Sequence, residues 1–125
     1  MRQRVRSIRR ETLEMILEAS RGSYPNEFGA MLRAEGEAVS EILLLPGTIA
    51  GQSHAIFQLH MMPIDFSVVG TVHSHPGPDA RPSPEDLEFF QRIGYIHIIA
   101  AYPFDEGSWR AWGRDGNPYP LEVVD

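Results

Sequence analysis

Two histidines separated by a single residue, His73 and His75, are the side chains most able to carry chemistry in this chain. On a β-strand they point to the same face, because side chains alternate along a strand with a period of two. A carboxylate follows at Asp86, so two imidazoles and one acid come from a short stretch of sequence. Three such ligands, with a fourth position left for water, are what a protein supplies to a catalytic zinc site. The spacing therefore predicts a zinc site.

The residues around the histidines predict the elements that hold them. The preceding stretch 66–72 is rich in β-branched residues and predicts a strand that leads into the histidines. The Gly- and Pro-rich stretch 77–82 predicts an exposed loop. Ser83 and Pro84 then predict a helix start, since serine is a favoured N-cap and proline a favoured first helical residue. A helix start of this kind can hold the Asp86 carboxylate rigidly.

The rest of the chain predicts an α+β domain in which helices flank a mixed sheet. Apolar residues at helical spacing predict helices over 8–20 and 83–92. Further strands are predicted over 28–33, 39–45, 55–59 and 95–101, followed by a terminal hairpin of 109–113 and 121–124 across Asp115-Gly116. The strand over 95–101 is strongly apolar and is expected inside the sheet. With 125 residues and no interdomain linker, we expect one domain over residues 1–125.

Composition excludes several classes of protein. The chain has no cysteine, so any metal must be held by histidine and carboxylate. The net charge is −6, and the acidic body argues against nucleic-acid binding. Five arginines within the first ten residues are expected to form a solvated helix start; the alternatives are gripping an acidic partner or folding back on the domain. No apolar run reaches the roughly 18 residues that span a bilayer, and no signal peptide is evident, so we expect a cytoplasmic protein without membrane contact.

The pattern His73-x-His75-Pro76, then six residues, then Ser83-x-x-Asp86 resembles the signature of the JAMM (MPN+) zinc metalloproteases. The likeness extends over essentially the whole chain and is to the short, stand-alone archaeal members. It implies the JAMM/MPN fold, which is similar to that of cytidine deaminases. One departure is Gly29-Ala30-Met31-Leu32, where many members have Gly-Leu-Leu after a glutamate. This is a packing difference and leaves the chemistry unchanged.

The resemblance also implies roles for individual residues. His73, His75 and Asp86 would hold Zn²⁺, and Glu27 would act as general base and then general acid. Ser83 would stabilise the oxyanion. Nothing in the spacing alone distinguishes Glu27 from the other glutamates. The bond cut would be the amide after the C-terminal Gly-Gly of a ubiquitin-like protein. The long insertions that larger relatives use to hold a distal ubiquitin have no room in this chain.

Two alternatives stay open. One is release of amino acids or adducts from a ubiquitin-like sulfur-carrier protein with a Gly-Gly tail, and the other is a non-catalytic MPN-type scaffold. Two other metal-dependent classes are excluded: a zinc deaminase needs a cysteine pair, and a barrel amidohydrolase needs about 250 residues. The remaining histidines and tryptophans receive structural interpretations, with a core position for His97, surface positions for His54 and His60, and packing roles for Trp109 and Trp112.

Overall fold

The computed structural model describes residues 4–44 and 67–125. Within these ranges the elements are β1 (Ser7–Arg9), α1 (Arg10–Ser23), β2 (Gly29–Glu35), β3 (Ala38–Leu43), β4 (Val68–His75), α2 (Pro84–Phe90), β5 (Ile96–Ala101), β6 (Trp109–Gly113) and β7 (Glu122–Val124). The described strands form one seven-stranded sheet in the order β6-β5-β4-β2-β3-β1-β7. Parallel pairs lie beside antiparallel pairs, so the sheet is mixed and the predicted α+β class is confirmed.

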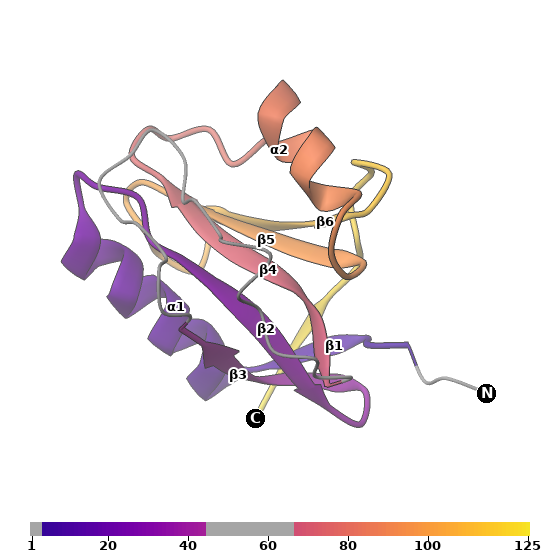
Figure 1. Cartoon of the computed structure of the whole chain (residues 1–125). Helices are drawn as coiled ribbons and strands as arrows, with labels where there is room; N and C mark the ends of the chain where they lie inside the picture. Colours follow the sequence, from indigo (N-terminus) through magenta and orange to yellow (C-terminus); the bar gives the residue numbers. More distant parts are fainter. Residues whose placement is uncertain (1–3, 45–66) are drawn as a thin grey trace.

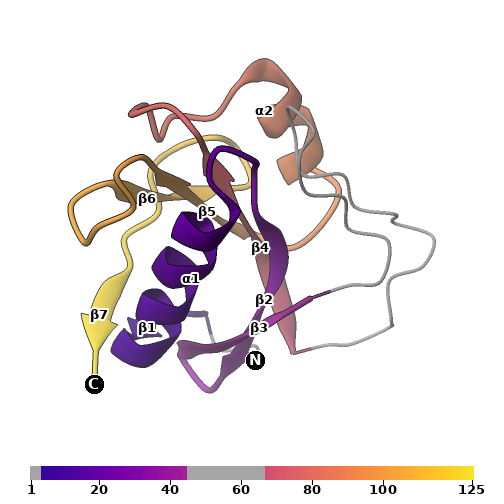
Figure 2. The same ribbon diagram turned by 90° about the vertical axis from the view of Figure 1, so that its left-hand side faces the viewer.

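The two helices lie on opposite faces of this curled sheet (Figures 1 and 2). Helix α1 buries Leu13 and Ile16 against one face, where they join a core cluster with Val72 of β4 and Ile98 of β5. Alternate residues of the same strands point to the other face, and there Phe90 of α2 packs on His97. All six residues of β5 are buried, which agrees with the predicted interior strand. The sheet thus separates the main core from the face that carries α2.

The N-terminal segment differs from the prediction. Residues 7–9 form strand β1 instead of a helix start, because Ile8 is fully buried between β3 and β7. Two of the arginines contact the domain: Arg10 pairs with Glu106 and Asp125, and the Arg4 guanidinium lies 5.0 Å from the ring centroid of Tyr95. The described arginines are exposed, as expected of a solvated segment, but a strand precedes the helix, and the contacts of Arg4 and Arg10 agree with the fold-back alternative.

The predicted terminal hairpin is also wrong. A turn does form at the expected place, since the Gly113 N–H donates to the Asn117 carbonyl at 2.7 Å. The returning chain then makes only an isolated bridge to β6, at Pro118. Proline has no N–H to donate to a ladder, and Pro120 follows two residues later. Strand β7 therefore leaves β6 and pairs in parallel with β1, at the opposite edge of the sheet.

Other predicted helices and strands are present, but their observed ends differ from the predicted ones. Strand β3 ends at Leu43, and helix α2 is shorter at its C-terminal end than the predicted helix over 83–92. The predicted strand over 55–59, with His54 and His60 beside it, lies outside the described residues. No helix in the described ranges is both long and apolar enough to cross a membrane.

Candidate metal centre

Strand β4 carries His73 and His75 at its C-terminal end, inside the sheet. The register pairs His73 with Gly29 of β2 and with Ile99 of β5. Both histidines lie on the α2 face, as the alternation along a strand predicts. The His73 side chain is buried, with 4% of the residue exposed, whereas His75 is half-buried. Strands on both sides of β4 therefore hold the two imidazoles with restricted rotation.

The start of helix α2 fixes the carboxylate of Asp86. The Ser83 hydroxyl accepts a hydrogen bond from the Asp86 N–H at 3.1 Å, and the Asp86 Oδ2 accepts one from the Ser83 N–H at 2.9 Å. This reciprocal pair is a capping box, which the Ser-Pro-x-Asp sequence predicts. Asp86 is 6% exposed, so its carboxylate faces the two imidazoles and not solvent. The helix cap therefore also orients a metal-ligating oxygen.

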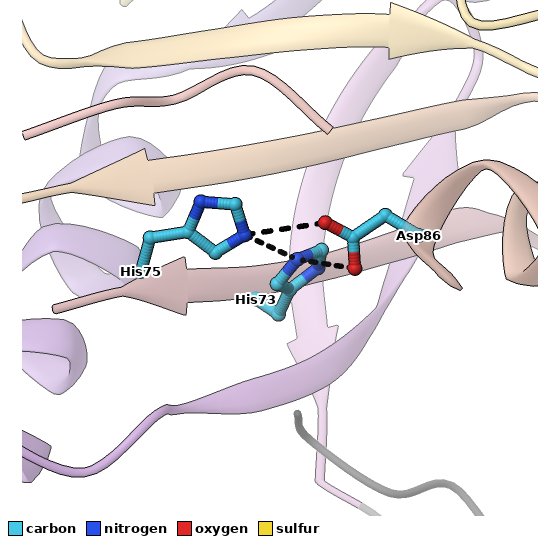
Figure 3. Close-up of side chains that lie close together, drawn as sticks. All are labelled: His73, His75 and Asp86. Atoms are coloured by element: carbon cyan, nitrogen blue, oxygen red, sulfur yellow. Dashed lines mark hydrogen bonds and ion pairs between the residues drawn. The ribbon is translucent and has the colours of Figure 1, made fainter. Parts of the chain in front are cut away.

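The three side chains meet at one point (Figure 3). The Nε2 atoms of His73 and His75 are 3.2 Å apart. The His73 Nε2 lies 3.2 Å from the Asp86 Oδ1, and the His75 Nε2 lies 3.2 Å from the Asp86 Oδ2. Zinc bonds of about 2.0–2.1 Å in a tetrahedron place neighbouring ligand atoms about 3.3 Å apart. All three separations match this value, and two imidazoles with a carboxylate are a donor set that zinc accepts. The cluster therefore fits Zn²⁺.

The charges of the cluster favour a cation. Burial opposes the charged form of Asp86, but hydrogen bonds from His73 and His75 hold the pKa of this carboxyl well below its ordinary value. Burial also lowers the pKa of His75, yet the Asp86 carboxylate, the Asp79 carbonyl and the charge of Glu27 together raise it above its ordinary value. A site that stabilises positive charge in this way can exchange a proton for a divalent cation.

Glu27 lies next to this cluster. The Phe28 N–H donates to the Ser74 hydroxyl at 2.8 Å, and the Ser74 N–H donates to the Phe28 carbonyl at 2.9 Å. With Gly29 opposite His73, this antiparallel pairing puts Glu27 opposite His75 and on the same face. Glu27 is 6% exposed, and its charge contributes to the raised pKa of His75. A buried carboxylate is thus aligned with His75, the half-buried member of the metal cluster.

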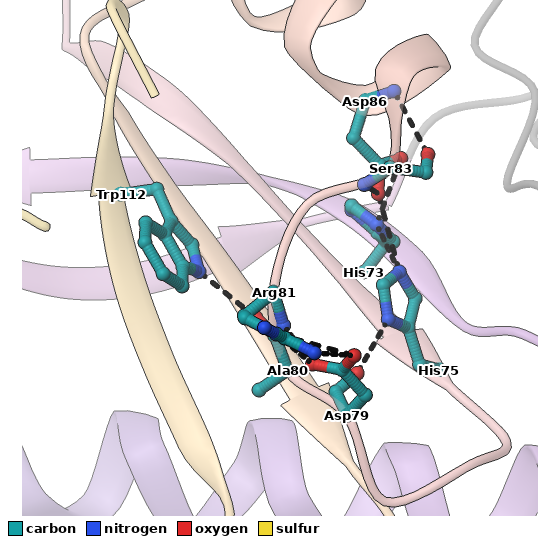
Figure 4. A network of polar contacts seen from close by, with 8 residues as sticks. All are labelled: His73, His75, Asp79, Ala80, Arg81, Ser83, Asp86 and Trp112. Carbon is teal, nitrogen blue, oxygen red and sulfur yellow. Dashed lines mark hydrogen bonds and ion pairs between the residues drawn. The ribbon is translucent and has the colours of Figure 1, made fainter. Parts of the chain in front are cut away.

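Sequence analysis missed two contributors to this arrangement. The side chain of Ser74, the residue between the histidines, points to the opposite face and joins β4 to the segment that carries Glu27. Trp112 is half-buried, and its indole also donates to the Ala80 carbonyl at 3.0 Å, beyond its predicted packing role (Figure 4). The alternation of β4 could have indicated the first contact. The second joins residues 32 positions apart, and no local pattern indicates it.

Two structural interpretations agree with the structure. His97 is fully buried, and its Nδ1 lies 2.7 Å from the Thr71 hydroxyl. Trp109 packs against the main core.

Comparisons with known proteins match this geometry. The family model for prokaryotic homologs of the JAB domain matches residues 9–115. A probable metalloprotease from Haloferax volcanii is 35% identical over 125 aligned positions, which cover 92% of this chain and 77% of that protein.

Solved structures extend the likeness to the whole fold. A JAB1/MPN domain protein from Archaeoglobus fulgidus is 42% identical, with a TM-score of 0.79 and coverage of 95% of this chain and 99% of that one. A structure of JAMM, presented as a metalloprotease-like zinc site in the proteasome and signalosome, is 40% identical, with a TM-score of 0.78 and coverage of 97% and 99%. The profile match, the sequence identities and the shared fold agree, and this chain belongs to the JAMM (MPN+) metalloprotease family.

Proposed function

We propose that residues 1–125 act as one zinc-dependent peptidase domain that hydrolyses the amide bond after the C-terminal Gly-Gly of a ubiquitin-like protein. The observation that carries the proposal is the set of 3.2 Å separations among His73, His75 and Asp86, with buried Glu27 aligned on the same face. The proposed activity includes that of an isopeptidase, which cuts the bond between the modifier and a lysine side chain of its target.

Each residue has a task in this proposal. His73, His75 and Asp86 would hold Zn²⁺, which would supply a Lewis acid that lowers the pKa of water and polarises a carbonyl. Glu27 removes a proton from the attacking water and later delivers it to the leaving amine.

Ser83 is the proposed hydrogen-bond donor to the oxygen of the reacting carbonyl. Its hydroxyl oxygen already accepts the Asp86 N–H, and a hydroxyl has one O–H to donate in addition to its lone pairs. That O–H is left for the oxygen on which negative charge develops during hydrolysis. Because the cap fixes the Ser83 oxygen, the donor is oriented before the substrate arrives.

The Gly-Gly substrate is supported by the family to which the chain belongs and by the position of the cluster. His73 and Asp86 are almost fully buried and only His75 is half-exposed, so a reacting carbonyl must approach through a restricted opening. Two glycines carry no side chains and let a polypeptide backbone approach closely. A tail of this kind can bind in an extended conformation through its main chain.

The test is cleavage of a linear fusion in which a ubiquitin-like protein ending in Gly-Gly precedes a reporter. We expect the unaltered protein to release the reporter, and both chelator treatment and Glu27→Gln to abolish release. Glu27→Gln should keep stoichiometric zinc, because Glu27 is not among the ligands. Glu35→Gln is the matched control, since Glu35 is an exposed glutamate at the far end of β2, the strand that begins two residues after Glu27.

The outcomes separate the alternatives. Full activity of Glu27→Gln contradicts the assignment of the base. Bound zinc without cleavage of the fusion favours release of adducts from a ubiquitin-like sulfur-carrier protein. A protein that binds no zinc and cleaves nothing is the non-catalytic scaffold.

A further inference from the structure

The second ring nitrogen of His75 connects the metal cluster to the loop over residues 77–82. The His75 Nε2 faces the cluster, and its Nδ1 lies 2.9 Å from the Asp79 carbonyl oxygen. A carbonyl can only accept, so Nδ1 carries a hydrogen, and the proton that a metal would displace is the one on Nε2, which faces Asp86. The position of one backbone carbonyl therefore selects the ligating tautomer of His75. That carbonyl lies outside helix and strand, so its position depends on what holds the loop.

Besides the contact of His75 with Asp79, three contacts involve this loop, and Figure 4 shows those of Arg81 and Trp112. The Tyr102 N–H donates to the Gly77 carbonyl at 3.0 Å, next to β4. Arg81 donates to both oxygens of the Asp79 carboxylate, and these hydrogen bonds lower the pKa of Asp79 to about 2. This pair lies within the loop and in solvent, where ion pairs contribute little and do not attach the loop to the sheet.

The third contact comes from the sheet itself. Trp112 lies on β6, opposite His97 of β5, and therefore on the same face as the metal cluster. Its indole N–H donates to the Ala80 carbonyl at 3.0 Å, one residue after the carbonyl that His75 contacts. The Trp112 side chain is half-buried, so water competes less for this bond than for the Asp79–Arg81 pair.

We propose that Trp112 is a positioning residue for zinc binding: its indole holds the Ala80 carbonyl and, through the loop, the Asp79 carbonyl that orients His75. The inference rests on the proposed role of His75 as a zinc ligand. It adds a residue on an edge strand, two strands away from β4, to those that determine the affinity for the metal. Partners of ligating histidines typically change metal affinity 10–100-fold when removed. Trp112 acts one contact further away, so we expect an effect of about 3- to 10-fold.

The first test compares Trp112→Phe with Trp109→Phe. Both residues belong to β6, but Trp109 packs on the main core, and within the described residues its indole forms no hydrogen bond with the loop. Zinc affinity is measured at one fixed pH by competition with a chromogenic chelator. We expect Trp112→Phe to bind zinc about 3- to 10-fold more weakly and Trp109→Phe to stay within about twofold of the unaltered protein. Equal affinities of the two variants overturn the inference.

The second test uses the unaltered protein and so does not depend on the folding of a variant. Coupling is reciprocal: if the indole contact favours zinc binding, zinc must stabilise the indole contact. The chain has only two tryptophans, so the two indole N–H signals are easily assigned by NMR. We expect zinc to slow hydrogen exchange at the Trp112 indole and to leave the Trp109 indole unchanged.

The two proposals fail in different ways. If zinc binds and the exchange rate of the Trp112 indole is unaffected, the positioning role is wrong while the zinc site stands. If the unaltered protein binds no zinc, the metal site of the proposed function fails first.

Discussion

The imidazole of His97 stacks on the phenyl ring of Phe90, with ring centroids 4.1 Å apart and an angle of 5° between the planes. Phe90 is the last residue of α2, the helix whose first turn carries Asp86. The stack therefore holds the helix against the sheet on the face that carries the metal cluster. A neutral imidazole suits this position, since a buried charge without a partner is costly.

The stack leads to a prediction about pH. Burial lowers the pKa of His97 to about 3 in the folded protein, compared with 6.5 in an unfolded chain. Between these values the unfolded chain binds the extra proton, so the stability provided by neutral His97 is complete above pH 6.5 and is lost as the pH falls toward 3. The free energy of unfolding of the zinc-free protein should fall by up to about 1.4 kcal/mol per pH unit in this window.

A double variant isolates this effect. Thr71→Val/His97→Phe keeps an aromatic ring against Phe90 and leaves no buried hydroxyl without a partner. We expect urea unfolding of the double variant to show a shallower pH dependence, while Thr71→Val alone keeps the original slope. A double variant with an unchanged slope would show that His97 is not the titrating group.

The second prediction concerns metal and stability. Zinc that binds only the folded protein stabilises it by about 2.7 kcal/mol at a concentration 100 times its Kd. We therefore expect zinc to raise the Tm of the unaltered protein and to leave the Tm of Asp86→Ala unchanged. Glu85→Ala, at the exposed neighbouring residue, should respond to zinc as the unaltered protein does. A zinc-dependent rise in the Tm of Asp86→Ala would remove Asp86 from the ligand set.

The third prediction concerns Ser83. Ser83→Ala should lower kcat by about 10²–10³-fold, because a donor to the developing oxyanion is lost. The same change removes the helix cap and should cost about 1 kcal/mol of stability. Ser83→Thr keeps the hydroxyl and should keep most of the kcat and most of the stability. Steady-state kinetics and urea unfolding separate the two effects. An unchanged kcat in Ser83→Ala would show that Ser83 serves only as the helix cap.

The fourth prediction compares one substitution at two glycines. A Cβ added at Gly70 of β4 meets the carbonyl oxygen of Ile96 on β5, whereas a Cβ added at Gly22 of α1 meets nothing. Gly70→Ala should therefore destabilise the protein by about 1–3 kcal/mol or more by forcing two paired strands apart. Gly22→Ala should stabilise the helix by up to about 1 kcal/mol. Chemical unfolding of both variants measures the difference, and effects of equal sign would contradict the close approach of β4 and β5.

Local patterns predicted the parts of the site that local geometry determines. The period of β4 puts His73 and His75 on one face, and the cap preference of serine fixes Asp86, so both follow from short stretches of sequence. Glu27 is different, because its place beside His75 results from the pairing of β2 with β4 across more than 40 residues. The spacing of residues along the chain does not predict the register between these two strands.

The errors have the same origin. The Asp115-Gly116 turn favours a hairpin, but the two prolines that follow prevent β7 from pairing with β6. Strand β1 is only three residues long, too short for a period to be recognised, and its existence depends on β3 and β7 beside it. Both errors concern pairings between segments that are distant in sequence.

The parallel pairing of β1 with β7 has a consequence for synthesis on the ribosome. The two partners are separated by more than 100 residues, so β1 gains its outer neighbour only when the last strand has left the exit tunnel. By that time β2, β4 and the start of α2 have long been made, and with them every residue of the metal cluster. The growing chain can therefore assemble the chemistry of the protein before its sheet is complete, and the far edge is the last part to close.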